Sequence, residues 1–292
     1  MKKNETQKLC EMCKEKEVEH IHHKDGNPKN NELKNLQGLC TLCHAKVHNI
    51  SPKQSELKRI VILRDRAIRI RNALDNQIMG LGRIEFAVPS QWGNERKFWD
   101  EKIKDYEKGL KQMLEGGEYP IWDKFLKDVK GISTITAAKL IAYIDIHNSP
   151  TVSALWRYCG LDATHVKRTN KISEEEALKF GNPYLKKELL GILGDNFIKQ
   201  RTPIYRKIYE EEKERQLERH KNGECERCTK LKLNKKPGHA HAMARRKAVK
   251  IFVSHLWQEW RKLEGLSVSE PYSIAILNHS QKIEVKEVLT YV

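Results

Sequence analysis

The chain has 292 residues, with 55 Lys and Arg against 39 Asp and Glu, which gives a formal net charge of +16 at pH 7. That basic excess favours a polyanionic partner, nucleic acid before an acidic membrane surface, with solubility alone as the alternative. No stretch approaches the roughly 20 apolar residues that span a bilayer, and the N-terminus lacks the apolar core of a signal peptide, so we expect a cytoplasmic protein.

Six of the seven cysteines are arranged as Cys-x-x-Cys pairs, namely Cys10/Cys13, Cys40/Cys43 and Cys225/Cys228. Thiols stay reduced inside the cell, so such pairs are better read as metal ligands than as disulfides. Four thiolates from two separate knuckles are a typical site for structural Zn²⁺. The first two pairs therefore predict a zinc that holds together an N-terminal module too short for a large core of its own.

The segment from Glu17 to His48 holds five of the twelve histidines. Its "HHKDGNP", the following Asn-Leu in "KNLQ" and the final "CHAKVH" resemble the HNH motif of the ββα-metal endonucleases, over roughly residues 10–48. The resemblance implies a small ββα fold that hydrolyses phosphodiester bonds with a divalent ion, Mg²⁺ or Mn²⁺, with Zn²⁺ or Ni²⁺ as alternatives. His20 matches no position of the motif.

The same resemblance implies a role for each polar residue of the motif. His23 corresponds to the general base, Asn35 to the residue that orients it, and three histidines to the ligands of the catalytic ion: His22, His44 and His48. His44 and His48 are four residues apart, so a helix would present them on one face. Imidazole suits the base because its ordinary pKa lies near neutrality. The alternative is a zinc ribbon that keeps nuclease-like residues without cutting.

Helical patterning dominates the remainder, and the expected fold is mainly α. Ser51 as N-cap and Pro52 in the first turn begin one long helix, and a second is expected from Asn94 to about Leu114, after "VPSQWGN". Together they would form a hairpin that spaces domains or pairs with a second subunit, and an ordinary bundle segment is the alternative. We expect an HNH module at 1–50, this hairpin at 51–118 and a helical nucleic-acid-binding domain at 119–292.

A helix-hairpin-helix element is predicted in "DVKGISTITAAKLIAYIDI". Its turn opens a helix whose free N–H groups suit a nucleic-acid phosphate. The predicted contact residues are Gly131, Ser133, Thr134 and Thr136. An ordinary packing corner between two helices is the alternative.

The order "GISTITAAKLIAYI", "ALWRYCGLDA", "GNPYLKKELLGIL" and "GHAHAMARRKAVKIFVSHLWQEWR" resembles the C-terminal domain of insertion-sequence transposases of the bridge-RNA recombinase type. The likeness covers about residues 119–275 and implies nucleic-acid binding. Two departures stand out. The RuvC-like domain of those transposases is replaced by the HNH module and the hairpin. Their nucleophilic Ser after "GL" has no counterpart, since the first Ser there, Ser173, lies in no matching context.

A second zinc site is predicted near the C-terminus, with Cys225 and Cys228 joined by His239 and His241. A basic helix follows, and its candidate phosphate contacts are Arg245, Arg246, Lys247 and Lys250. A solvated charged face is the alternative for that helix.

These features predict a metal-dependent HNH endonuclease that acts on DNA, from a mobile element or virus. Structured RNA is the alternative partner, no membrane is expected, and the hairpin is compatible with a homo-oligomer. Two other functions stay open: a non-catalytic zinc-containing nucleic-acid-binding protein, and a transposase-related protein that acts with a guide RNA.

Overall fold

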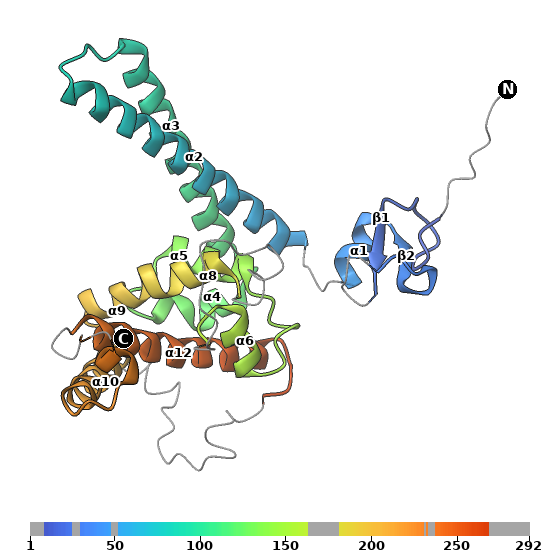
Figure 1. The fold of residues 1–292 in the computed structure, drawn as a ribbon. Coiled ribbons are helices and arrows are strands. Elements are labelled where there is room, and N and C mark those ends of the chain that lie inside the picture. Colours follow the sequence, from blue (N-terminus) through green and yellow to red (C-terminus); the bar gives the residue numbers. More distant parts are fainter. Residues whose placement is uncertain are drawn as a thin grey trace. The chain divides into compact units, whose positions relative to one another are not determined.

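The computed structural model describes residues 9–24, 30–47, 52–162, 181–230, 232 and 237–268. The chain divides into two compact units, Met1–Arg59 and Ile60–Val292. The fold is mainly α, as expected, with one small two-stranded sheet in the described part (Figure 1). Three positions singled out from the sequence lie outside the described residues: His48, Ser51 and Ser173. No helix of the described part is long and apolar enough to cross a bilayer.

The N-terminal unit has a ββα arrangement. Strand β1 (His20–His23) pairs antiparallel with β2 (Leu36–Leu39), in a register that sets His23 beside Leu36. A short 3₁₀ helix, η1 (Leu33–Asn35), leads into β2, and helix α1 (Thr41–Val47) follows it. Residues two apart in a strand share a face, so His20 and His22 project from the same side of β1.

The core of this unit is small and rich in cysteine. Cys10, Cys40 and Cys43 are buried together with Leu39, the last residue of β2. Gly38 lies so close to Val18 that a Cβ at this position would come within 3.0 Å of the valine Cγ2. One leucine among three cysteines offers little apolar area, so this unit needs a further source of stability.

Two long helices form the predicted hairpin, α2 (Pro52–Arg83) and α3 (Ser90–Glu115), which run side by side (Figure 1). Helix α3 begins at Ser90, earlier than the sequence suggested, because Pro89 is already the extended residue that precedes a helix, with ψ 131°. Ion pairs link the two helices, such as Arg96 of α3 to Asp75 of α2 at 2.6 Å.

The rest of the second unit is a helical body. Its elements are α4 (Pro120–Lys124), η2 (Leu126–Asp128), α5 (Thr134–Tyr143), α6 (Val152–Tyr158), α8 (Pro183–Lys186), the π-helical turn η3 (Lys187–Leu193), α9 (Gly194–Lys199), α10 (Pro203–Lys221), α11 (Glu226–Lys230) and α12 (Gly238–Leu263).

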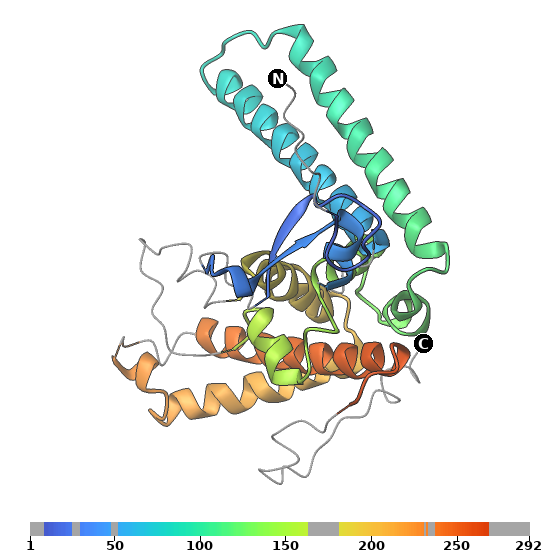
Figure 2. The ribbon, with the colours of Figure 1, turned by 90° about the vertical axis from the view of Figure 1, so that its right-hand side faces the viewer.

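Helix α12 lies at the centre of this body and runs alongside α10 (Figure 2). Phe252 of α12 contacts three aromatic rings from other elements: Phe125, Phe197 and Tyr205. All four side chains are fully buried. The apolar face of α12 therefore forms part of the core.

Candidate metal centres and nuclease site

The four N-terminal cysteines come together as predicted. The sulfur atoms of Cys10, Cys13, Cys40 and Cys43 all lie within 4.8 Å of one another. Cys10 and Cys13 belong to a turn closed by the Leu9–Glu17 bridge, while Cys40 follows β2 and Cys43 lies in α1. Two local knuckles thus meet across the sheet, and the set could hold a structural zinc ion.

The backbone around this cluster favours thiolates. Burial raises the pKa of the Cys10 thiol, but hydrogen bonds from the backbone of Cys13, Cys40 and Met12 outweigh that effect and lower the pKa to about 6. Burial and the neighbouring thiols raise the pKa of Cys43 to about 12. A dication bound among the four sulfur atoms would stabilise the thiolate form of every cysteine.

Three histidines gather on the face of β1 that meets α1. The ring centroids of His22 and His44, both assigned as metal ligands by the HNH resemblance, lie 5.5 Å apart at a steep angle. His20, which the motif does not use, stacks on His44 with centroids 4.8 Å apart and ring planes 15° from parallel. His22 is buried, with 8% of its surface exposed.

A chain of polar contacts holds His20 in place. His20 Nε2 lies 3.1 Å from the Thr41 hydroxyl, at the first residue of α1. Glu19 accepts hydrogen bonds from both the backbone N–H and the hydroxyl of Thr41, which lower the pKa of the Glu19 carboxyl. The carboxylate thus caps the positive end of α1 and orients the hydroxyl that His20 contacts. Sequence spacing gives no signal for this arrangement, because it depends on the contact between β1 and α1.

The proposed base, His23, has a partner that sequence reasoning missed. His23 Nε2 lies 3.2 Å from Asn31 Oδ1. Asn35, to which the motif assigns the orientation of the base, is buried, and its side-chain amide donates to the carbonyl of Asn30 at 2.8 Å. Asn35 therefore ties down the chain next to Asn31, and with it the contact to His23.

The second cysteine pair also has histidine neighbours, but one of them differs from the prediction. Ligand atoms of His220, Cys225, Cys228 and His239 lie within 4.8 Å of one another, and the set could hold a structural zinc ion. His241 is not in this set, because its Nδ1 lies 2.7 Å from the Tyr209 hydroxyl. Residues 239 and 241 both belong to α12, where two residues apart means nearly opposite sides. The prediction of His241 was wrong, and His220 takes its place.

The predicted helix-hairpin-helix turn is packed against the body. Gly131 has φ +97°, and its carbonyl accepts a hydrogen bond from the Asn196 side chain at 3.1 Å. Ser133 is the N-cap of α5 and accepts from the Thr136 backbone N–H. Thr136 itself is 3% exposed, so it does not support the expected phosphate contact. Ser133 and the half-buried Thr134 stay at the surface as candidates.

Most of the predicted phosphate-binding side chains of α12 already contact other side chains of the protein. Arg245 pairs with Asp195 at 2.6 Å, and Lys247 pairs with Glu212 at 2.8 Å. The Lys250 ammonium lies 3.9 Å from the centre of the Trp156 ring, and burial lowers its pKa. Arg246 is also half-buried. This face is therefore less open to phosphates than the sequence suggested, and nucleic-acid contact there stays a prediction.

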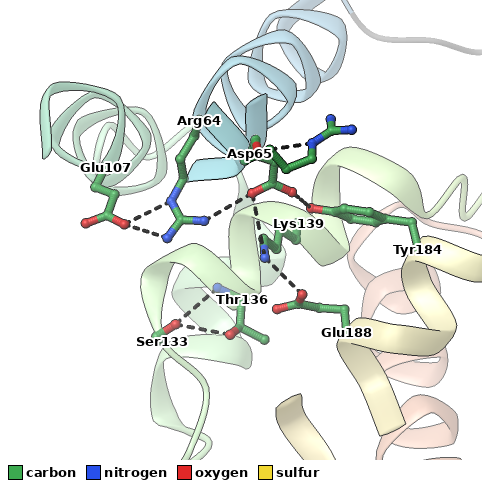
Figure 3. Close-up of polar contacts among 9 residues, drawn as sticks. Arg64, Asp65, Glu107, Ser133, Thr136, Lys139, Tyr184 and Glu188 are labelled. Carbon is green, nitrogen blue, oxygen red and sulfur yellow. Dashed lines mark hydrogen bonds and ion pairs between the residues drawn. The ribbon is translucent and has the colours of Figure 1, made fainter. Parts of the chain in front are cut away.

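A buried polar network joins the base of the hairpin to the body (Figure 3). Asp65 of α2 accepts from the Tyr184 hydroxyl at 2.6 Å and pairs with Arg64, while Lys139 reaches Glu188 at 2.9 Å and Asp65 at 4.0 Å. Burial and the Asp65 carboxylate raise the pKa of Tyr184 far above its ordinary value. This phenol therefore stays protonated and is a poor candidate for a nucleophile.

Much of this polar network lies in a transposase-like segment. A family model described as the Transposase IS116/IS110/IS902 family matches residues 123–210, from α4 into α10. The match includes Lys139, Tyr184 and Glu188, whereas both metal clusters and the hairpin lie outside it. No curated protein and no solved structure shows significant similarity to the chain.

Proposed function

We propose that the protein is a metal-dependent endonuclease in which an HNH head cuts the nucleic acid that a transposase-like body holds. The observation that carries this proposal is the meeting of His22 and His44 on one face of the ββα unit, with His23 next along the strand. The donor set suits a divalent ion, because two imidazoles from a strand and a helix converge there.

His23 is the general base in this proposal. If Nε2 donates its proton to Asn31 Oδ1, the Nδ1 lone pair stays free to take a proton from water. Asn35 maintains that orientation through its bond to the Asn30 carbonyl. A divalent ion on His22 and His44 would supply charge stabilisation at the phosphate. His48, the third ligand of the motif, completes the proposed set from outside the described residues.

The four-cysteine zinc has a separate, structural role. It joins the turn that holds Cys10 to the start of α1, on which His44 lies. With little apolar core in this unit, the metal is what fixes α1 against the sheet. Zinc removal should therefore abolish cutting by unfolding the head rather than by removing the reactive ion.

The body supplies affinity in this proposal. The family match over residues 123–210 supports DNA binding, and the net charge of +16 supports a polyanion. The first Ser after "GL", Ser173, lies in no matching context of the recombinase motif, so the proposal assigns the cutting step to the head rather than to the body. DNA is the proposed substrate, and structured RNA is the second class to test.

The proposal is tested with purified full-length protein and supercoiled plasmid in Mg²⁺ or Mn²⁺. Conversion to relaxed or linear DNA with 5′-phosphate ends is the expected result, because the activated water attacks phosphorus and the 3′ oxygen departs. His44→Ala should need far more Mn²⁺ for the same rate. A protein that shifts plasmid on a gel yet leaves it supercoiled with every divalent ion would be the non-catalytic alternative.

A further inference from the structure

A second group of metal-binding side chains lies in the helical body, far along the chain from the head. His220 lies at the end of α10, and His239 lies in the first turn of α12. Cys225 directly precedes α11, and Cys228 lies within that helix. The pair of cysteines is local, but the two histidines come from helices that meet only in the folded body. The group also lies outside residues 123–210, so the transposase family match says nothing about it.

The distances in this group suit one tetrahedral ion. Cys228 Sγ lies 3.1 Å from His239 Nδ1 and 3.9 Å from His220 Nε2, and Cys225 Sγ lies 3.6 Å from His239 Nδ1. With Zn–S near 2.3 Å and Zn–N near 2.0 Å, neighbouring ligand atoms around zinc are roughly 3.3–3.8 Å apart. The observed separations bracket that range.

The His220 side chain is fully buried and has few polar contacts among the described residues. The residue is 0% exposed, and its Nδ1 has no hydrogen-bond partner among the described residues. Its Nε2 approaches the Cys228 sulfur, a weak acceptor. A metal ion bound at Nε2 would replace this weak contact with a coordinate bond, which favours an ion among these ligands. The rings of His220 and His239 stack with centroids 5.2 Å apart, and a nitrogen of each lies within 4 Å of the Cys228 sulfur.

We propose that His220, Cys225, Cys228 and His239 bind a second zinc ion, and that this ion pins the end of α10 to the start of α12. Two thiolates neutralise the charge of the dication, so its burial is electrostatically feasible. Four protein ligands leave no open position, which makes the site structural rather than catalytic. Helices α10 and α12 form a long antiparallel pair, and the ion closes the end at which they are joined through α11 (Figure 2).

The test counts zinc per chain in the full-length protein by inductively coupled plasma mass spectrometry, with folding checked by circular dichroism. Wild type should hold two zinc ions, and Cys40→Ser, which disables the head cluster, should hold one. His220→Ala should lose the second ion, whereas His220→Cys should keep it because a thiolate can replace the imidazole. His241→Ala is the matched control: it lies two residues from His239, and it should keep both ions.

Cobalt provides an independent readout. Co²⁺ bound to the Cys40→Ser protein should show the charge-transfer absorption of two thiolates, and His220→Cys in that background should raise it by about half, toward three thiolates. Two zinc ions in folded His220→Ala would overturn the proposal, as would loss of an ion in His241→Ala. If His220→Ala does not fold, the Cys40→Ser protein still tests the proposal. A Cys40→Ser protein that holds no zinc, or that contains a Cys225–Cys228 disulfide, would contradict the second zinc site.

Discussion

His20 stacks on His44 with ring centroids 4.8 Å apart, although the HNH motif has no use for a histidine at position 20. The Thr41 hydroxyl and Glu19 anchor His20 behind the proposed ligand. Hydrogen-bonded outer partners fix the orientation of a ligating imidazole and change metal affinity when they are removed, and a ring stacked on the imidazole restricts its orientation in a similar way. We infer that His20 positions His44.

His20→Ala should therefore raise the Mn²⁺ concentration needed for half-maximal cutting by roughly 10–100-fold, with a much smaller change in the rate at saturating Mn²⁺. His20→Phe keeps the stacked ring and should lie between alanine and wild type. A titration of nicking rate against Mn²⁺ separates the two parameters. Active His20→Ala with an unchanged Mn²⁺ requirement would remove the positioning role and leave the nuclease proposal intact.

The head should depend on its zinc for folding. Cys40→Ser removes one of the four sulfur ligands, so the ββα unit should lose its ordered structure while the helical body stays folded, because the two units have separate cores. Backbone amide signals of β1 and α1 in hydrogen exchange report the loss directly. Protection of those amides at the wild-type level in a zinc-free protein would show that the cysteines are dispensable.

Lys139 should contribute strongly to the stability of the body. Its ammonium is nearly buried and pairs closely with Glu188, so Lys139→Met leaves the buried Glu188 carboxylate without its cation, while Asp65 keeps its ion pair with Arg64 (Figure 3). Breaking a buried ion pair on one side costs about 3–5 kcal/mol in the free energy of unfolding. Urea unfolding followed by circular dichroism measures it. Lys127→Met, which removes an exposed pair with Asp123, should cost less than about 1 kcal/mol.

Glu212 should make stability depend on acid pH. Burial opposes ionisation, but hydrogen bonds from Arg215, Lys247 and Gln216 prevail and lower the pKa of Glu212 to about 2. The pKa in the folded protein is thus below the unfolded value near 4.5, so the stabilisation is full above pH 4.5 and is lost as pH falls toward 2.

The matching variant is Glu212→Gln. It should be about 2 kcal/mol less stable than wild type at pH 7, and the gap should narrow steadily below pH 4.5. Unfolding free energies at pH 7, 5, 4 and 3 supply the comparison. A gap that stays constant across this range would mean that Glu212 acts through packing rather than through its charge.

Residue spacing in the sequence predicted those structural features that depend only on residues close together in the chain. The Cys-x-x-Cys knuckles and the helix start at Pro52 both follow from short-range rules. His220 could not be found in this way, because it joins Cys228 only when α10 and α12 pack together. The prediction of His241 is wrong because residues two apart in a helix lie on nearly opposite sides, so His239 and His241 cannot converge on one ion.

Most polar contacts of the proposed site likewise could not be predicted from residue spacing. The motif points to Asn35, whose role in orienting the base stays a prediction, and its side-chain amide donates to the Asn30 carbonyl, next to Asn31. The contact of Asn31 with His23, and the network around Asp65 and Lys139, have no signal in sequence spacing. Both arise where elements distant in sequence meet, and only a folded structure brings those side chains together.

The most direct test of the proposed cutting chemistry is the single-turnover rate of DNA cleavage by His23→Ala in saturating Mn²⁺. A general base contributes about 10²–10⁴-fold, so this variant should cut at least 100-fold more slowly than wild type while keeping its zinc content and DNA affinity. His147→Ala, a partly exposed histidine of the body that pairs with Glu264, should cut at the wild-type rate. Cleavage by His23→Ala at the wild-type rate would contradict the assignment of His23 as the base and, with it, the HNH mechanism proposed for the head.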